Sequence, residues 1–166
     1  EKFEDGFIDA TDKIKELIPG KSAKGIKCWS LDNEIFQDHF PGFPTTPGVL
    51  LNESMAQLAG ILIEHSYYKE FNTTSPVYPV LSIIHKAKFR TFVQPGDQCF
   101  IDAELTTVDR GKASARVKTV VDGKLVCEAV LSFVIGTAND TKSNPYLSKR
   151  QQYYHTILPE NFKNDI

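Results

Sequence analysis

The stretch VLLNESMAQLAGILIEHSY, residues 49 to 67, has ten apolar side chains among its first fifteen positions. At the spacing of an α-helix they cover nearly the whole circumference instead of a single stripe. A helix of this length that is apolar on all sides is buried when it occurs in a soluble protein. The pattern therefore predicts one helix in the centre of the fold.

The residues before this helix predict a rigid entry. Residues 40–48, FPGFPTTPG, hold three prolines and two glycines, which neither a regular helix nor a central strand tolerates. Pro47 suits the first helical turn, and Gly48 lets the backbone approach a neighbour closely. Further upstream, TDKIKELI at 11–18 has the apolar spacing of a short helix that Pro19 and Gly20 end. Residues 24–37 are expected to be extended.

After the helix, the apolar pattern changes to a period of two. Four long strands are predicted at 80–92, 97–108, 112–121 and 124–135. Short links rich in glycine separate them, so we expect consecutive strands to pair antiparallel. The predicted fold class is α+β, with one long antiparallel sheet curling around one central helix. We expect a single domain over 1–136, followed by a polar C-terminal extension over 137–166 that is either mobile or packed as a cap.

Length and composition exclude several classes of protein. A chain of 166 residues with 41% hydrophobic and 24% charged residues fits one folded domain. The formal net charge of −2 makes nucleic acid an improbable partner. Cys28, Cys99 and Cys127 form no C-x-x-C pair, and no stretch is long enough to span a membrane, so we expect a soluble, cytoplasmic protein.

A carboxyl group in the central helix is the first candidate for chemistry. Glu53 and Gln57 are four residues apart and share one helical face, and most of their neighbours are apolar. Burying an unpaired ionised carboxylate costs on the order of several kcal/mol, so Glu53 either pairs, for example with Gln57, or binds a proton. The first outcome is structural, and the second makes a general acid. Position alone leaves both open.

The entry to the helix supplies two further groups. His39 precedes the rigid loop, between Asp38 and Phe40, where a neutral imidazole suits a general base, although a lone histidine is more often structural. The backbone N–H groups of Gly48 and Val49 have no partner within the helix and carry its partial positive charge. They would stabilise a carbonyl oxygen that gains negative charge. Together these groups suit proton abstraction beside a carbonyl, with loss or gain of water.

The motifs of competing chemistries are missing. The sequence has no G-x-G-x-x-G, no G-x-x-x-x-G-K-[ST], no H-E-x-x-H and no G-x-S-x-G. Nucleotide, zinc and serine-hydrolase sites are therefore not expected.

The segment DHFPGFPTTPGVLLNESMAQLAG, residues 38–60, resembles that of FabZ-type (3R)-3-hydroxyacyl-acyl carrier protein dehydratases. In that family a His-Phe-Pro-Gly loop leads through Pro-Gly-Val into the central helix. The likeness extends through residues 85–98 and 121–133. It implies the hotdog fold, in which a long antiparallel sheet wraps one helix.

The resemblance also implies roles for particular residues. His39 matches the family's catalytic base, and Glu53, fourteen residues later, matches its carboxylate partner. Close relatives that also isomerise the double bond carry Asp at the helix position, so Glu53 favours simple dehydration. The family's Pro-Gly-Val element, whose glycine N–H polarises the thioester carbonyl, falls on residues 47–49. The residues expected to bind substrate are Gly48, Val49, Phe40 and Gln57.

The implied partners are a carrier protein and a second copy of the chain. In the family, the histidine of one subunit faces the carboxylate of the other, dimers commonly assemble into hexamers, and neither metal nor cofactor is needed. Lys86, Lys88 and Arg90 recur at every second position of a predicted strand, so they share one face. That basic face either steers an acidic acyl carrier protein or is a solvated edge that discourages association between sheets.

The chain departs from the family pattern in the predicted strand at 80–92 and at the C-terminal end, among other places. Residues 80–85, VLSIIH, replace the family's Tyr-Phe-x-x-Ile-Asp, and the last thirty residues exceed the usual family end. Two other functions also remain open on the same scaffold. One is a hotdog thioesterase or an acyl-CoA hydratase, and the other is a module that binds an acyl group or a carrier protein without catalysis.

Overall fold

The computed structural model describes residues 10–137 and 153–165. Parts of the expected domain and of the expected extension, at 1–9, 138–152 and 166, lie outside the described residues. The elements that carry the fold are β1 (Lys13–Ile18), β2 (Ser22–Cys28), α1 (Ile35–Asp38), α2 (Gly48–Phe71), β3 (Val77–Phe89), β4 (Gln98–Val108), β5 (Lys112–Val121), β6 (Lys124–Thr137) and the 3₁₀-helix η2 (Glu160–Asp165).

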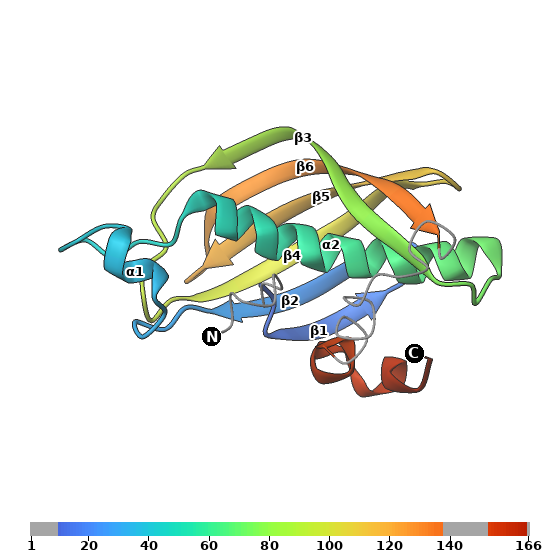
Figure 1. The fold of residues 1–166 in the computed structure, drawn as a ribbon, viewed down its shortest axis with the longest axis horizontal. Helices are drawn as coiled ribbons and strands as arrows, with labels where there is room; N and C mark the ends of the chain where they lie inside the picture. The colour runs from blue at the N-terminus through green and yellow to red at the C-terminus, as the bar shows by residue number, and fades with distance from the viewer. Residues whose placement is uncertain (1–9, 138–152, 166) are drawn as a thin grey trace.

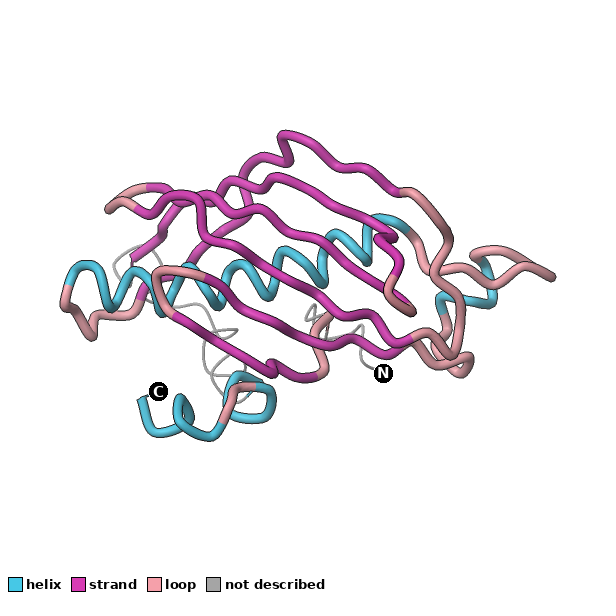
Figure 2. Tube along the Cα trace, turned by 180° about the vertical axis from the view of Figure 1, so that it is seen from behind, coloured by secondary structure: helices cyan, strands magenta, loops and turns pink. Residues whose placement is uncertain are grey.

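One antiparallel sheet wraps around α2, as the sequence predicts. Its strand order is β1-β2-β4-β5-β6-β3, and every neighbouring pair is antiparallel. Figure 1 shows the helix lying along the sheet, and the view from behind in Figure 2 shows the strands crossing it. The α+β prediction of one sheet around one helix is confirmed.

The helix α2 is the core of the molecule. It runs from Gly48 to Phe71, four residues beyond the predicted end, and most of its side chains are buried. Met55, Leu58, Ile61 and Leu62 are fully excluded from solvent. Burying each large apolar side chain contributes about 1.5–3 kcal/mol. No helix within the described ranges combines the length and the low polarity that a bilayer crossing needs.

The predicted helix at 11–18 is wrong, because residues 13–18 form strand β1. Ile14 and Leu17 are both buried although they are three apart, a spacing typical of helices. A bulge between Ile14 and Glu16 takes up the extra residue and turns both side chains to the core. Gly20, at a φ of +84°, makes the tight turn into β2. Pairing with β2 therefore overrides the weak local preference for a helix.

The expectation that each strand pairs with the next is wrong for β3 and β4. β3 pairs with β6 at one edge of the sheet, and the strands β5 and β6 separate it from β4. The link at 90–97 is long enough to cross the end of the sheet, unlike the two-residue turn between β5 and β6. The other two predicted pairs, β4 with β5 and β5 with β6, are confirmed.

The described part of the C-terminal segment packs against the domain. Residues 153–157 form a helical turn, and Tyr154, Ile157 and Leu158 are buried. The Tyr153 hydroxyl donates a hydrogen bond to the Thr11 carbonyl oxygen and accepts one from the Thr11 N–H at 3.3 Å. Residues 153–165, here called the C-terminal segment, lie beside β1 (Figure 1).

Candidate active site

The proline-rich loop before α2 is held by its own backbone. Phe40 and Phe43 exchange hydrogen bonds between their N–H and carbonyl groups, at 3.1 and 2.9 Å. The loop is tied to the buried Val93, whose carbonyl accepts from the Thr46 N–H at 2.7 Å and from the Thr45 hydroxyl at 3.3 Å. This segment is therefore fixed before the helix begins, as the sequence predicts.

His39 is oriented by that loop. Its ring Nδ1 lies 2.9 Å from the Thr45 carbonyl oxygen, and its ring stacks on Phe40 with centroids 4.1 Å apart. A carbonyl oxygen only accepts hydrogen bonds, so Nδ1 carries the proton of the neutral imidazole. The lone pair then resides on Nε2, which is the atom able to take a proton.

Gly48 begins α2 in a confined place. A Cβ built on it would lie 3.0–3.1 Å from three ring atoms of Phe89, so only glycine fits without moving that ring. The N-cap is Pro47, and the first N–H groups of the helix have no partner inside it. Val49, expected to bind substrate, is 75% exposed, and Phe40 is half exposed.

Glu53 and Gln57 are in contact on the helix surface. The Gln57 side-chain nitrogen donates to Glu53 Oε1 at 3.3 Å, while its oxygen accepts from the Ala10 N–H at 3.2 Å. The Ala10 contact fixes which end of the amide faces Glu53. Both side chains are half-buried, so Gln57 holds one carboxylate oxygen in place.

Glu53 lies in the wall of a cavity of about 150 Å³. Ala56, Gln57, Gly60 and Ile61 of α2 continue that wall along the helix. The other lining residues come from β3, β6 and the C-terminal segment: Pro79, Leu81, Phe133, Tyr153 and Tyr154. The cavity is therefore mainly apolar, with a carboxyl group in its wall.

The structure does not bring all the candidate residues together within one chain. Glu53 and Gln57 share the cavity, whereas His39, Phe40, Gly48 and Val49 do not line it. Among the described residues, no hydrogen bond or ion pair joins His39 to Glu53.

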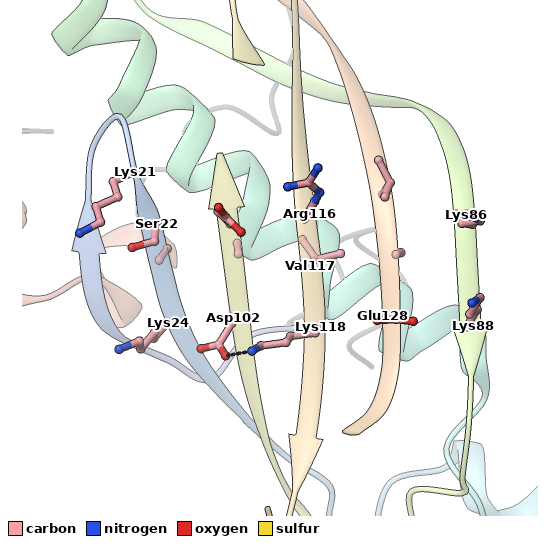
Figure 3. A pocket seen from close by; sticks show the side chains of 15 residues that line it. Lys21, Ser22, Lys24, Lys86, Lys88, Asp102, Arg116, Val117, Lys118 and Glu128 are labelled. Atoms are coloured by element: carbon pink, nitrogen blue, oxygen red, sulfur yellow. Dashed lines mark ion pairs between the residues drawn. The ribbon is translucent and has the colours of Figure 1, made fainter. Parts of the chain in front are cut away.

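The basic residues Lys86, Lys88 and Arg90 lie on the face of the sheet that points away from α2. There a groove of about 600 Å³ crosses five strands (Figure 3). Arg90 pairs with Glu128 at 2.5 Å, and Glu128 is opposite Lys88 in the register. The groove lies between two rows of paired side chains: Lys24, Asp102, Lys118, Glu128 and Lys88 in one, and Ser22, Glu104, Arg116, Val130 and Lys86 in the other.

Positive charge is in excess in this groove. Its lining includes six basic residues (Lys21, Lys24, Lys86, Lys88, Arg116 and Lys118) and three acidic ones (Asp102, Glu104 and Glu128). Lys118 and Asp102 form an ion pair at 3.4 Å, drawn in Figure 3.

Sequence reasoning missed two groups at the candidate site. Phe89 reaches Gly48 only through the tertiary fold, and no local pattern indicates that contact. Tyr153 and Tyr154 reach the cavity although they follow Glu53 by about a hundred residues. The only indication in the sequence was that these two tyrosines are aromatic residues within a polar stretch. Cys99 is a core residue, and its burial raises the pKa of its thiol to about 12.

Comparison with known proteins defines the class. A family model described as the FabA-like domain matches residues 5–130, about three quarters of the chain. Among solved structures, the dehydratase heterocomplex ApeI:P from Xenorhabdus doucetiae has a TM-score of 0.62 at 15% identity, covering 80% of this chain and 86% of that one. The smu.793 protein from Streptococcus mutans, bound to acetyl CoA, has a TM-score of 0.61 at 11% identity, covering 79% and 93%. These structures share the fold, and the family match makes this chain a FabA-like hotdog protein.

Sequence relatives narrow the class to one family. The chain is 39% identical over 124 residues to the 3-hydroxyacyl-[acyl-carrier-protein] dehydratase FabZ of Caldicellulosiruptor saccharolyticus, covering 75% of this chain and 85% of that protein. It is 41% identical over 131 residues to the protein of that name from Pediococcus pentosaceus, covering 79% and 84%. The chain therefore belongs to the FabZ dehydratase family and is a hydro-lyase.

Proposed function

We propose that this chain removes water from a (3R)-3-hydroxyacyl thioester held on acyl carrier protein, giving the trans-2-enoyl thioester in acyl-chain biosynthesis. The observation that carries the proposal is the carboxyl group of Glu53 in the wall of a mainly apolar cavity. Such a cavity suits an acyl chain, and the carboxyl suits a departing hydroxyl. The substrate named for the curated relatives agrees with this chemistry.

The proton at C2 of the substrate goes to His39. The hydrogen bond from its Nδ1 to Thr45 leaves Nε2 as the acceptor. Breaking the C2–H bond leaves an electron pair that moves into the new double bond as the C3–O bond breaks. Proton transfer by a positioned group contributes typically about 10²–10⁴-fold to the rate.

The C3 hydroxyl leaves as water after it takes a proton from Glu53. Gln57 donates to Glu53 Oε1 and is itself fixed by Ala10. This holds the carboxyl at one side of the cavity, so Gln57 is a positioning residue. After the water leaves, the proton on His39 returns to Glu53, directly or through solvent, and restores both groups for the next turnover.

The thioester oxygen gains negative charge as C2 loses its proton. The N–H groups of Gly48 and Val49 at the start of α2 would stabilise it, together with the positive end of the helix dipole. Because Gly48 has no side chain, its N–H stays accessible although the Phe89 ring lies close by.

A complete site requires two copies of the chain. The described residues of one chain leave His39 outside the cavity that Glu53 lines, so each cavity would take its histidine from a second copy. β3 is an edge strand of thirteen residues with exposed apolar side chains at Val80, Ile83 and Ile84. This edge suits pairing with the same strand of another copy, giving a homodimer that can assemble further into a hexamer.

The carrier protein would dock through basic residues. Lys86, Lys88 and Arg90 lie at the groove in which basic residues outnumber acidic ones, and this charge suits an acidic partner. We also place the activity in the cytoplasm, because all three cysteines are free, as expected in a reducing compartment.

The decisive test is hydration of an enoyl thioester by two variants. His39→Ala and Glu53→Gln should each lower kcat/KM by about 10³-fold or more while leaving the fold and the assembly unchanged. Ser75→Ala, exposed in the link between α2 and β3 and outside both the proposed site and the edge strand, is the control and should keep full activity. Circular dichroism and size-exclusion chromatography verify folding and assembly.

Two outcomes would contradict the proposal. Full activity in either variant removes that residue from the mechanism. Release of free thiol from an acyl thioester, without hydration of the enoyl form, would identify a thioesterase instead.

A further inference from the structure

The C-terminal segment reaches the cavity that contains Glu53. It lies beyond residue 130, where the match to the family model ends. Two of its side chains, Tyr153 and Tyr154, line the cavity together with the helix α2. The aromatic rings are 6.3 Å apart, and Tyr154 is 8% exposed. A segment outside the family match therefore contributes part of the cavity wall.

Hydrogen bonds and buried apolar side chains hold the C-terminal segment in place. The Tyr153 hydroxyl bonds to both backbone groups of Thr11, just before β1. Ile157 and Leu158 are almost fully buried and anchor the next turn in the core. Because these contacts fix the segment, the part of the cavity wall formed by Tyr153 and Tyr154, here called the tyrosine wall, is a rigid part of the fold.

The cavity follows the helix away from Glu53. Glu53, Gln57, Gly60 and Ile61 lie on one face of α2, and the eight steps from residue 53 to residue 61 span about 12 Å of helix. A chain that begins at the carboxyl therefore runs along this face. The length of that chain is limited by the room that the cavity offers.

The size of the cavity indicates a short acyl group. Its volume is about 150 Å³, which is roughly that of an engineered apolar cavity that binds one benzene molecule. An acyl chain of about six carbon atoms fills such a space. Tyr153 and Tyr154 line this space, so their rings occupy room that a longer chain would need.

We propose that Tyr153 and Tyr154 set the length of the acyl chain that this enzyme accepts, by narrowing the cavity that they line together with Glu53. This inference rests on the proposed function, because it takes the occupant of the cavity to be the acyl chain of the substrate. It assigns to the C-terminal segment a role in substrate selection.

The first test enlarges the cavity. Tyr154→Ala should raise kcat/KM for long 2-enoyl thioesters relative to short ones, by roughly fourfold for each methylene that becomes buried. The assay uses a series of saturated-tail enoyl thioesters on carrier protein, from four to sixteen carbon atoms. The change should appear mainly in KM, because the reacting atoms at His39 and Glu53 are not altered.

The matched control is Ile157→Ala. Ile157 is buried in the same segment but does not line the cavity, so it loses packing of the segment without opening the wall. Its ratio of long-chain to short-chain kcat/KM should remain that of the unmodified enzyme. An equal shift in both variants, or no shift in Tyr154→Ala, would overturn the inference.

A second variant narrows the cavity and does not depend on the stability of the segment. A Cβ added at Gly60 would meet no atom within 4 Å, and alanine favours the helix over glycine. Gly60→Ala should therefore fold well and lower kcat/KM for the longest accepted chain by about fourfold, with little change for the shortest. Unchanged chain-length preference in this variant also contradicts the inference.

Different results would refute the proposed function and the proposed role of the tyrosine wall. If the unmodified chain hydrates no enoyl thioester of any length, the proposed function is wrong. If it hydrates them and the preference for length is the same in all variants, the function holds and the role of the tyrosine wall is refuted.

Discussion

At the scale of single residues, the contact between Gly48 and Phe89 sets a limit on the candidate site. The Phe89 ring comes so close to Gly48 that a Cβ there would lie 3.0–3.1 Å from three of its atoms. Phe89 itself is half exposed, so its ring can be displaced at some cost. Gly48 therefore has two reasons to be glycine: room for the ring and access to its N–H.

This contact predicts that the effect of Gly48→Ala depends on Phe89. In the unmodified background the substitution should destabilise the fold by about 1 kcal/mol, because the ring must shift. In a Phe89→Ala background it should be neutral or stabilising, since alanine favours a helix by up to about 1 kcal/mol over glycine. Urea unfolding of the four proteins measures the coupling.

Gly60→Ala is the control for this cycle. Gly60 lies in the same helix with open space around it, so alanine there should stabilise the protein with or without Phe89. Equal effects of Gly48→Ala in both backgrounds would show that the ring does not constrain Gly48.

The candidate residues could be predicted only as far as local spacing reaches. Glu53 and Gln57 share a helical face in the sequence, and they are hydrogen-bonded in the structure. The ring atom of His39 that holds the proton follows from a contact with Thr45 in the same loop. The sequence has no local pattern that joins Tyr154 to Glu53, because that contact depends on how the C-terminal segment returns to α2.

At the scale of elements, strand patterns were reliable where they were regular. β4, β5 and β6 alternate between buried and exposed side chains and were predicted within a few residues. β1 was mistaken for a helix because its bulge sets two buried residues three apart. β3 carries two register shifts, and its position at the edge of the sheet depends on the length of the link at 90–97.

The attachment of the C-terminal segment to β1 leads to a stability prediction. Tyr153→Phe removes the hydroxyl that bonds both backbone groups of Thr11. The free energy of unfolding should fall by about 0.5–1.5 kcal/mol, the usual value of such hydrogen bonds. Chemical denaturation followed by circular dichroism measures it.

Tyr67→Phe is the comparison for this variant. The Tyr67 ring packs against Phe71, 4.6 Å between centroids, and its hydroxyl makes no hydrogen bond within the described part of the chain. Its loss should change stability by less than about 0.5 kcal/mol. If both variants lose the same stability, the hydroxyl of Tyr153 does not hold the segment.

At the scale of the whole molecule, the proposed division of the site between two copies can be tested by mixing two variants. His39→Ala and Glu53→Gln are each expected to be inactive alone. When they are unfolded together in equal amounts and refolded, mixed dimers should contain one site with both residues intact. Activity should then return to about a quarter of the unmodified level, because half of the dimers are mixed and each has one working site of two.

The reference for this experiment is each variant refolded alone. Neither should regain activity, and size-exclusion chromatography should give the same assembly in all three samples. A mixture that stays inactive would place His39 and Glu53 in the same copy and would refute a site shared between subunits.

In a single copy of the chain, β3 leaves one edge of the sheet without a paired strand. Thirteen residues of this strand pair on one side only, and Ile83, Ile84 and Phe89 are exposed along it. Unpaired strand edges with apolar side chains recruit further strands, in the manner of fibrils. If copies pair through β3 as proposed, the pairing covers this edge, so a copy without its partner is the form that other strand edges can join.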